Sequence, residues 1–221
     1  ANYEAVKAAE DAAASVAEAV DAIANCDIMA TAVGARILKF IVPNIVAGLR
    51  KRWAMGSDPL NIIICENLMD ANKVIEGMLK ALLSEEEQAW FDANIGLVEA
   101  SIGRMVPVMT EEKRQGNPLR VYVEPYNILP VDKDAFKGEI PDVENLYPFA
   151  PFNLFIQRKL FMHNMSHAVT AYLGNLCGYE YIWEAIDDAR IRYVALRALL
   201  ESALAMHKEH GVDIADLLDH C

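Results

Sequence analysis

Apolar residues recur along the first half of the chain with two different periods, one typical of helices and one typical of buried strands. Strong helix formers with Val and Ile at helical spacing predict an amphipathic helix over residues 3–25. The short apolar run 26–34 ends in small residues and a glycine, which predicts a buried strand followed by a turn. A second helix is predicted over 35–53, kinked or split by Pro43, and a second largely apolar strand over 60–65.

Helices that alternate with largely apolar strands are typical of a parallel sheet covered on both faces. The pattern therefore predicts an α/β, partial Rossmann-like (doubly wound) domain. Ligands of such sheets bind beyond the carboxyl ends of the strands. In this sequence those ends are residues 31–34 and 65–67, which makes both of them candidate site positions.

The stretch that follows is predicted to be less regular. Residues 70–92 predict two helices, and 95–101 and 119–125 predict two more strands. The polar residues 110–117 predict a surface loop. Six of the nine prolines lie within 107–148, so we expect turns, strands and connections there rather than long helices.

After the last proline the pattern becomes helical throughout. Helices are predicted over 154–176, 182–209 and 214–220, and no strand is predicted among them. The sequence therefore predicts two domains. Residues 1–150 form the remainder of a dinucleotide-binding domain with a strand-rich connection, and 151–221 form the start of a mainly α-helical substrate or catalytic domain.

Composition and charge limit the classes of function. The chain is 54% hydrophobic and 24% charged, which is typical of a folded globular protein. Its net charge of -12 argues against a nucleic-acid partner, because neutralising phosphates takes a dense face of Lys and Arg. No apolar run approaches the roughly 20 residues that cross a bilayer, so no membrane partner is expected.

The four cysteines give an expectation about the compartment. They are far apart in the sequence and form no CxxC pair or metal-ligand spacing: Cys26, Cys65, Cys177 and Cys221. We expect them to be buried, reduced thiols, which indicates a cytoplasmic protein. Neither a monomer nor a dimer is favoured by the sequence.

Three polar side chains share one side of the helix predicted over 154–176. At about 100° per residue, His167 lies about 80° and Asn164 about 140° around the helix from Lys159. One interpretation is a solvated lysine beside an ordinary helix histidine. The other is a proton-transfer site, in which a lysine with a lowered pKa acts as general base and an amide stabilises an oxyanion. Spacing alone permits both.

The segment Gln157–Gly178 resembles a known enzyme family. Its Arg-Lys-Leu-Phe, Asn-x-x-His-Ala and Ala-Tyr-Leu-Gly elements are similar to those of mannitol-1-phosphate 5-dehydrogenases, which belong to the polyol-specific long-chain dehydrogenases. The Lys-x4-Asn-x2-His motif of that family is filled by the three residues just described. Residues 31–34 and 59–67 resemble the strand ends on the nicotinamide side of the same family, so the resemblance covers essentially the whole chain in order.

The resemblance implies an NAD-dependent oxidoreductase that interconverts mannitol 1-phosphate and fructose 6-phosphate without a metal. It implies Lys159 as the general base, Asn164 and Asn67 as hydrogen-bond donors to the oxyanion, and His167 as the residue that orients substrate hydroxyls. The cofactor-binding residues that it implies lie at strand ends: Thr31, Ala32, Val33, Gly34 and Asn67.

Two arginines are candidates for the phosphate of a small-molecule polyol phosphate. Arg158 belongs to the Arg-Lys-Leu-Phe element, and Arg104 follows a predicted strand in a segment that also resembles the family. A guanidinium group suits bidentate binding of phosphate. Both arginines equally suit ordinary surface salt bridges.

The chain departs from the family where the cofactor phosphates are bound. It contains no GxGxxG turn, whose backbone amides cradle a pyrophosphate, and no acidic residue placed to bind the adenosine ribose. We therefore expect a fragment that lacks the N-terminal GxGxxG region and the C-terminal end, with a weak hold on NAD and weak activity by itself. The sequence leaves open NADP as the cofactor and the direction of the reaction.

Two alternatives stay open. One is a related mannitol or hexuronate/hexonate dehydrogenase whose substrate carries no phosphate. The other is a non-catalytic helical interaction module, whose polar helix face would bind a partner protein.

Overall fold

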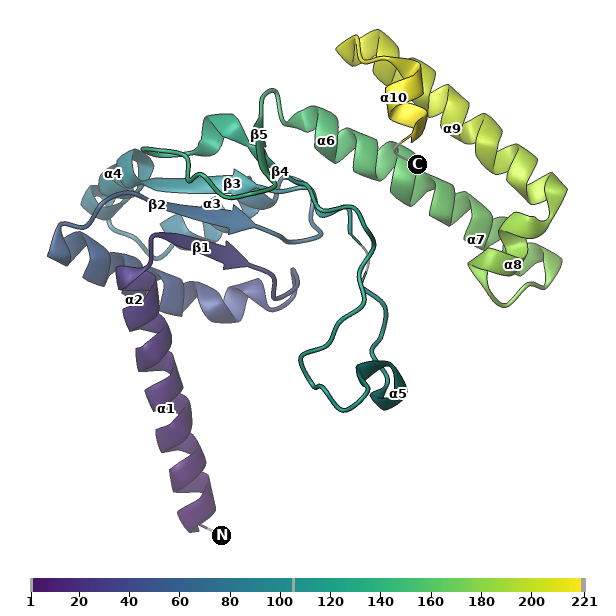
Figure 1. The fold of residues 1–221 in the computed structure, drawn as a ribbon. Helices are drawn as coiled ribbons and strands as arrows, with labels where there is room; N and C mark the ends of the chain where they lie inside the picture. The colour runs from purple at the N-terminus through teal and green to yellow at the C-terminus, as the bar shows by residue number, and fades with distance from the viewer. Residues whose placement is uncertain (1, 105, 220–221) are drawn as a thin grey trace. The chain divides into compact units, whose positions relative to one another are not determined.

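The chain divides into two compact units, Ala1–Pro151 and Phe152–Cys221, which are described separately. In the computed structural model (Figure 1), the backbone is described for residues 2–104 and 106–219, and side chains for 14–104 and 106–218.

The first unit is built on a parallel sheet. Within its described residues, β1 (Ile28–Thr31), β2 (Leu60–Ile64) and β3 (Ile95–Glu99) are hydrogen-bonded in the order β1-β2-β3. The last residue of each strand lies opposite the last residue of its neighbour, so the three carboxyl ends are level. This edge is where such sheets bind ligands.

The helices of the first unit precede or connect these strands (Figure 1). Helix α1 (Asn2–Asn25) leads into β1, α2 (Leu38–Met55) connects β1 to β2, and α3 (Ala71–Lys80) and α4 (Glu85–Asn94) connect β2 to β3. Apolar residues from all four helices share one core cluster with one face of the sheet. The two crossovers therefore cover the same face.

Strand β2 is buried on both faces because its side chains alternate between two cores. Leu60, Ile62 and Ile64 pack against the helices. Ile63 points the other way and packs with Val98 and Val131. The strand predicted from the short apolar run 60–65 is therefore confirmed, and it is buried on both faces.

The second face of the sheet is covered by an irregular segment with short elements. It contains β4 (Leu129–Asp132), the 3-10 helix η1 (Lys133–Ala135) and β5 (Leu146–Phe149), with β4 and β5 paired in parallel. The buried Asn61 fastens this segment to the sheet, because its Oδ1 accepts from the Lys137 amide at 2.8 Å and its Nδ2 donates to the Lys137 carbonyl at 3.0 Å.

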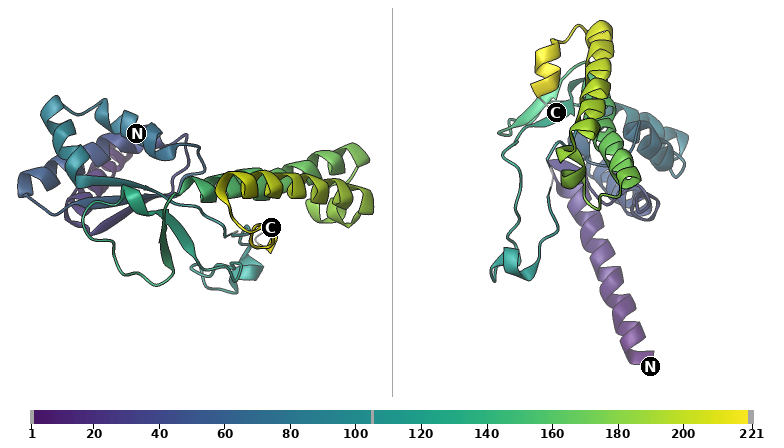
Figure 2. Two further views of the ribbon diagram at one scale, coloured as in Figure 1. Left: turned by 90° about the horizontal axis from the view of Figure 1, so that it is seen from above. Right: turned by 90° about the vertical axis from the view of Figure 1, so that its right-hand side faces the viewer.

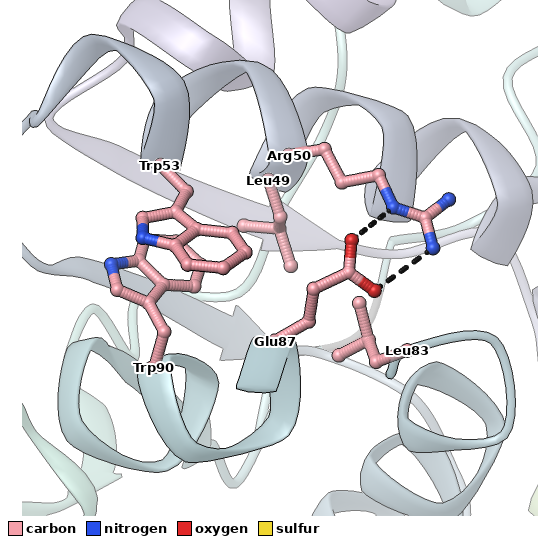
Figure 3. Close-up of a pocket in the computed structure, with 6 residues that line it drawn as sticks. All are labelled: Leu49, Arg50, Trp53, Leu83, Glu87 and Trp90. Carbon is pink, nitrogen blue, oxygen red and sulfur yellow. Dashed lines mark hydrogen bonds and ion pairs between the residues drawn. The ribbon is translucent and has the colours of Figure 1, made fainter. Parts of the chain in front are cut away.

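Helices α2 and α4 are braced against each other by a ring pair and an ion pair (Figure 3). The rings of Trp53 and Trp90 are stacked with centroids 5.8 Å apart. Arg50 donates to both carboxylate oxygens of Glu87, at 2.6 and 3.0 Å. Glu87 also completes a capping box with Ser84. Its bond to Arg50, and then its bond to the Ser84 amide, lower the pKa of the Glu87 carboxyl to about 2.

The second unit begins with one long helix in three parts. Helix α6 (Asn153–Arg158) passes into the π-helix η2 (Lys159–Asn164) and then into α7 (Met165–Cys177) without a break. The prediction of one helix over 154–176 is confirmed, and the π-helical part was not foreseen.

Three further helices complete the described part of the second unit. These are α8 (Ile182–Asp187), α9 (Ala189–His210) and α10 (Ile214–Asp219), and α9 lies alongside α7 in both Figure 1 and Figure 2. Asp188 separates α8 from α9, since its carboxylate accepts from the Arg190 amide at 2.8 Å and caps α9. The prediction of a single helix over 182–209 is therefore wrong.

The α/β unit followed by a helical unit confirms the predicted fold class. Helix α2 runs through Pro43, so of the two effects expected of this proline the split does not occur. Two local predictions are wrong. Residues 119–125 form no strand. Strand β1 lies at the sheet edge with Ile28 exposed, so it is not a buried strand. The predicted loop over 110–117 contains one helical turn, α5 (Glu111–Arg114).

The cysteines only partly follow expectation. Cys26 and Cys65 are partly buried free thiols, and burial raises the pKa of each. Cys177 is free but exposed, so the expectation of burial is wrong there. Cys221 lies outside the described residues.

Among the helices that the structure describes, none combines the length and the apolar character needed to cross a bilayer.

Replacing Gly96 by Ala is expected to lower the free energy of unfolding by about 1–3 kcal/mol, as overpacking does in other cores. A Cβ at Gly96 would lie 2.2 Å from Asn61 Oδ1 and 2.7 Å from the Ala135 carbonyl oxygen. The control is Gly77→Ala, because nothing lies within 4 Å of a Cβ at that helical position. It should stabilise by about 0.5–1 kcal/mol. Urea unfolding of both variants checks this, and equal effects would contradict it.

Candidate functional site

At the carboxyl end of β1 the chain makes a turn that is held by a buried carboxylate. Glu66 is 8% exposed and follows β2. Its Oε1 accepts from the Val33 amide at 3.0 Å and its Oε2 accepts from the Gly34 amide at 2.8 Å. Gly34 adopts φ +87°, a conformation that favours glycine. The turn is therefore fixed by residues from two neighbouring strand ends.

Thr31 places an unsatisfied polar atom at the same edge. Within the described part of the chain its hydroxyl oxygen is buried and has no hydrogen-bond partner, and the residue is 2% exposed. A buried hydroxyl without a partner costs free energy, which a ligand that bonds to it would recover. The other predicted cofactor-side residues are exposed at the strand ends: Ala32, Val33, Gly34 and Asn67.

These residues suit a cofactor better than a metal ion. A buried hydroxyl and an open glycine turn lie at the edge where parallel sheets bind nucleotides. Among the described residues, no three His, Cys, Asp or Glu side chains gather as metal ligands.

In the second unit, Lys159 and Asn164 are the first and last residues of the π-helix. Its hydrogen bonding reaches one residue further than in an α-helix, as the Met165 amide shows by donating to the Leu160 carbonyl. Residues five apart are then brought towards the same side of the helix, instead of about 140° apart as in an α-helix. In the π-helix, Lys159 and Asn164 therefore lie at a smaller angle around the helix axis than the 140° or so of an α-helix. Isolated π-turns occur frequently at functional sites.

The Lys159 amine is in an unfavourable environment for a charge. The residue is partly buried, and burial lowers the pKa of its amine below the usual value. None of the salt bridges found within the described residues involves Lys159. A lysine whose charged form is destabilised in this way is present as the neutral amine, which can accept a proton, at a lower pH than an exposed lysine.

The ring of His167 is held by its own helix. Nδ1 lies 2.9 Å from the His163 carbonyl oxygen, which also accepts from the Ser166 hydroxyl at 2.8 Å. Because a carbonyl oxygen only accepts, Nδ1 carries the proton in this bond. In the neutral imidazole, Nε2 is then the nitrogen that accepts a hydrogen bond. His167 is thereby prepared to accept from a hydroxyl group.

The two candidate phosphate-binding arginines lie in different units. Arg158 ends α6, and its guanidinium lies over the Phe155 ring, 4.7 Å from the centroid. Arg104 follows β3 and donates from Nε to the Tyr126 carbonyl at 2.5 Å. Arg104 and Tyr126 also line a cavity of about 200 Å³ in the first unit. Each guanidinium is thus oriented by a neighbour within its own unit.

Two contributors were missed from sequence. Glu66 lies within a strand end that the sequence singled out, but its bonds reach residues 32 and 33 positions earlier, which no local pattern reveals. Ser166 lies three residues after His163, a spacing at which hydroxyl side chains bond back to helix carbonyls. That spacing was a usable signal.

Comparison with known proteins identifies the family. Residues 1–145 match the model of the mannitol dehydrogenase Rossmann domain, and residues 152–220 match that of the mannitol dehydrogenase C-terminal domain. The chain belongs to the mannitol dehydrogenase family. The match to both domains in order agrees with the resemblance that the motif of the long helix indicates.

Two solved structures share the fold. A mannitol 2-dehydrogenase from Pseudomonas fluorescens, in a ternary complex with NAD and D-mannitol, matches with a TM-score of 0.73 and 21% identity over 96% of this chain and 51% of that one. A D-sorbitol dehydrogenase in substrate-free form matches with a TM-score of 0.68 and 18% identity over 80% of this chain and 45% of that one. The chain thus spans about half the length of these mannitol and sorbitol dehydrogenases.

Replacing Lys159 by Met is expected to raise the free energy of unfolding at neutral pH, because it removes a partly buried ammonium group. The folded-state pKa of Lys159 lies below the unfolded one, so the wild type gains stability as pH rises between these two values. The advantage of the Met variant should therefore shrink towards about pH 10.

Urea unfolding at several pH values measures this difference, with Lys208→Met as the control on the exposed surface of α9. A pH-independent difference for Lys159→Met would contradict the role of burial.

Proposed function

We propose that the chain carries catalytic residues of an oxidoreductase that transfers a hydride between NAD and a sugar alcohol. The observation that carries this proposal is Lys159, a partly buried amine of lowered pKa in a π-helix that also holds Asn164. Membership of the mannitol dehydrogenase family supports the reaction class. The NAD and D-mannitol bound to the Pseudomonas fluorescens mannitol 2-dehydrogenase support the cofactor and the substrate class.

Each residue has a defined part in the proposed reaction. NAD supplies the acceptor for the hydride that leaves the carbinol carbon. The amine of Lys159 takes the hydroxyl proton, because a hydride leaves an alkoxide more readily than an alcohol. The amide of Asn164 donates to the developing oxyanion, and Nε2 of His167 accepts from a neighbouring substrate hydroxyl. The carbinol becomes a carbonyl as the proton and the hydride depart.

The strand-end residues form the cofactor side of the proposal. Thr31 offers a buried hydroxyl without a partner among the described residues, and the exposed residues Ala32–Gly34 lie beside it. Asn67 is exposed after β2, and its amide is proposed to donate to the same kind of oxygen as Asn164 does.

The identity of the sugar alcohol is a separate proposal. We infer mannitol 1-phosphate, interconverted with fructose 6-phosphate, because Arg158 occupies the Arg-Lys-Leu-Phe element and Arg104 lines a cavity large enough for a phosphate. Unphosphorylated mannitol is the second candidate. It is favoured by the D-mannitol in the Pseudomonas fluorescens mannitol 2-dehydrogenase complex.

Lys159→Ala in the full-length protein is expected to lower kcat for polyol oxidation by about 10²–10⁴, the usual contribution of a general base. The rise of the rate with pH that deprotonation of this amine produces should also disappear. Steady-state rates across the pH range test both effects, with Lys208→Ala as the control.

Two results would contradict the catalytic role. Full activity of Lys159→Ala at every pH would exclude Lys159 as the base. A wild-type protein that turns over no polyol would favour the helical interaction module instead.

Arg104→Met and Arg158→Met test the phosphate. Each is expected to lower kcat/KM for mannitol 1-phosphate by about tenfold to a hundredfold, the usual loss of a charge-assisted hydrogen bond, and to leave the rate with mannitol unchanged. Arg197→Met, on the exposed face of α9, is the control. A wild type that prefers mannitol to mannitol 1-phosphate would establish the second candidate.

A further inference from the structure

The turn after β1 has the form of an anion site, but its amides are already used. Backbone amides in a turn between a strand and a helix commonly bind phosphate. Here the Val33 and Gly34 amides donate to the two oxygens of the Glu66 carboxylate, at 3.0 and 2.8 Å. An internal anion therefore occupies the position that a phosphate would take.

This arrangement determines which charge a ligand can carry when it binds at the turn. A phosphate arriving here would find its donors engaged and would meet a nearly buried carboxylate of the same sign, with Glu66 only 8% exposed. A neutral group meets no such penalty, and a positively charged ring is attracted. Thr31, buried at the preceding strand end, offers a hydroxyl that has no partner within the described residues. Together these features suit a ring that is polar, cationic and unphosphorylated.

We propose that Glu66 is a positioning and charge-selecting residue for the cofactor. Its carboxylate fixes the turn Thr31–Gly34 and favours the cationic nicotinamide ring of NAD+ over the neutral ring of NADH, while it excludes the pyrophosphate from this edge. This inference rests on the proposed function, because it takes NAD as the ligand.

The matched control for Glu66 is Glu87. Glu87 also accepts from a backbone amide, that of Ser84, but it lies on α4 where it pairs with Arg50, in the brace between α2 and α4 (Figure 3). Glu87→Gln should lower stability without changing cofactor binding. Glu66→Gln keeps the shape and removes the charge, and Glu66→Asp keeps the charge but shortens the reach to the two amides.

The first measurement needs no cofactor. Hydrogen exchange of the Val33 and Gly34 amides should be faster in Glu66→Gln and in Glu66→Asp than in the wild type, because both variants weaken the bonds that protect these amides. In Glu87→Gln the exchange of these amides should match that of the wild type.

The second measurement compares the two redox forms of the cofactor by titration of the full-length protein. In Glu66→Gln the ratio of the Kd for NAD+ to the Kd for NADH should rise by about tenfold, the effect of losing roughly one favourable charge interaction. Glu66→Asp should keep the wild-type ratio, since the charge is retained. A purely structural role would weaken both forms equally.

The outcomes separate the two proposals. A wild-type protein that binds neither NAD+ nor NADH overturns the proposed function. A wild type that binds both, with an unchanged ratio in Glu66→Gln, overturns the present inference alone. If Glu66→Gln does not fold, Glu66→Asn is compared with Glu66→Asp, because this pair has the same length and differs in charge. A higher ratio in Glu66→Asn supports the inference, and equal ratios overturn it.

Discussion

The burial of β2 on both faces is the constraint on which the first unit depends. One set of its side chains packs on helices and the other on the segment that contains β4 and β5. Both neighbours are therefore held in register with it, and their carboxyl ends are level. A shift of β2 by one residue would break the bonds of Asn61 to Lys137 and turn this amide into the helix core, so Glu66 emerges at a fixed place beside the turn after β1.

Glu66 in the first unit and Lys159 in the second are both withdrawn from solvent, and they differ in how their charges are accommodated. The Glu66 carboxylate is stabilised by two backbone amides. The Lys159 amine has no ion-pair partner among the described salt bridges, and its burial lowers its pKa. A satisfied buried charge holds structure in place, whereas an unsatisfied one is available for chemistry. The same distinction separates the proposed positioning residue, Glu66, from the proposed general base, Lys159.

Much of the fold follows from periodicity, and the failures have physical causes. The strands β2 and β3 were predicted because short apolar runs between predicted helices are typical of buried strands. Residues 119–125 also alternate in polarity, yet Leu119, Val121 and Val123 are exposed and none of the strands that the structure describes pairs with them. Strand formation there would need a partner that a local pattern does not reveal.

The site was predicted unevenly for the same reason. Lys159, Asn164 and His167 lie in one helix, so their grouping is visible from spacing. The bonds of Glu66 connect residues more than thirty positions apart, and the orphaned hydroxyl of Thr31 depends on packing from several elements. The π-helix was missed because the spacing of its apolar residues fits the period of an α-helix almost equally well. The buried Met162 inside it, for example, packs with α9 and α10 as a residue of an α-helix would.

The π-helix also changes how the spacing of Lys159 and Asn164 in the sequence relates to their positions around the helix. Over the same rise, a π-turn accommodates one residue more than an α-helix does, so α6 and α7 continue as one helix on either side of it. Lys159 and Asn164 then face as residues four apart would in an α-helix, at about 40° rather than about 140°. Their separation of five residues is therefore equivalent to a single helical turn, and the additional residue is absorbed by the bulge.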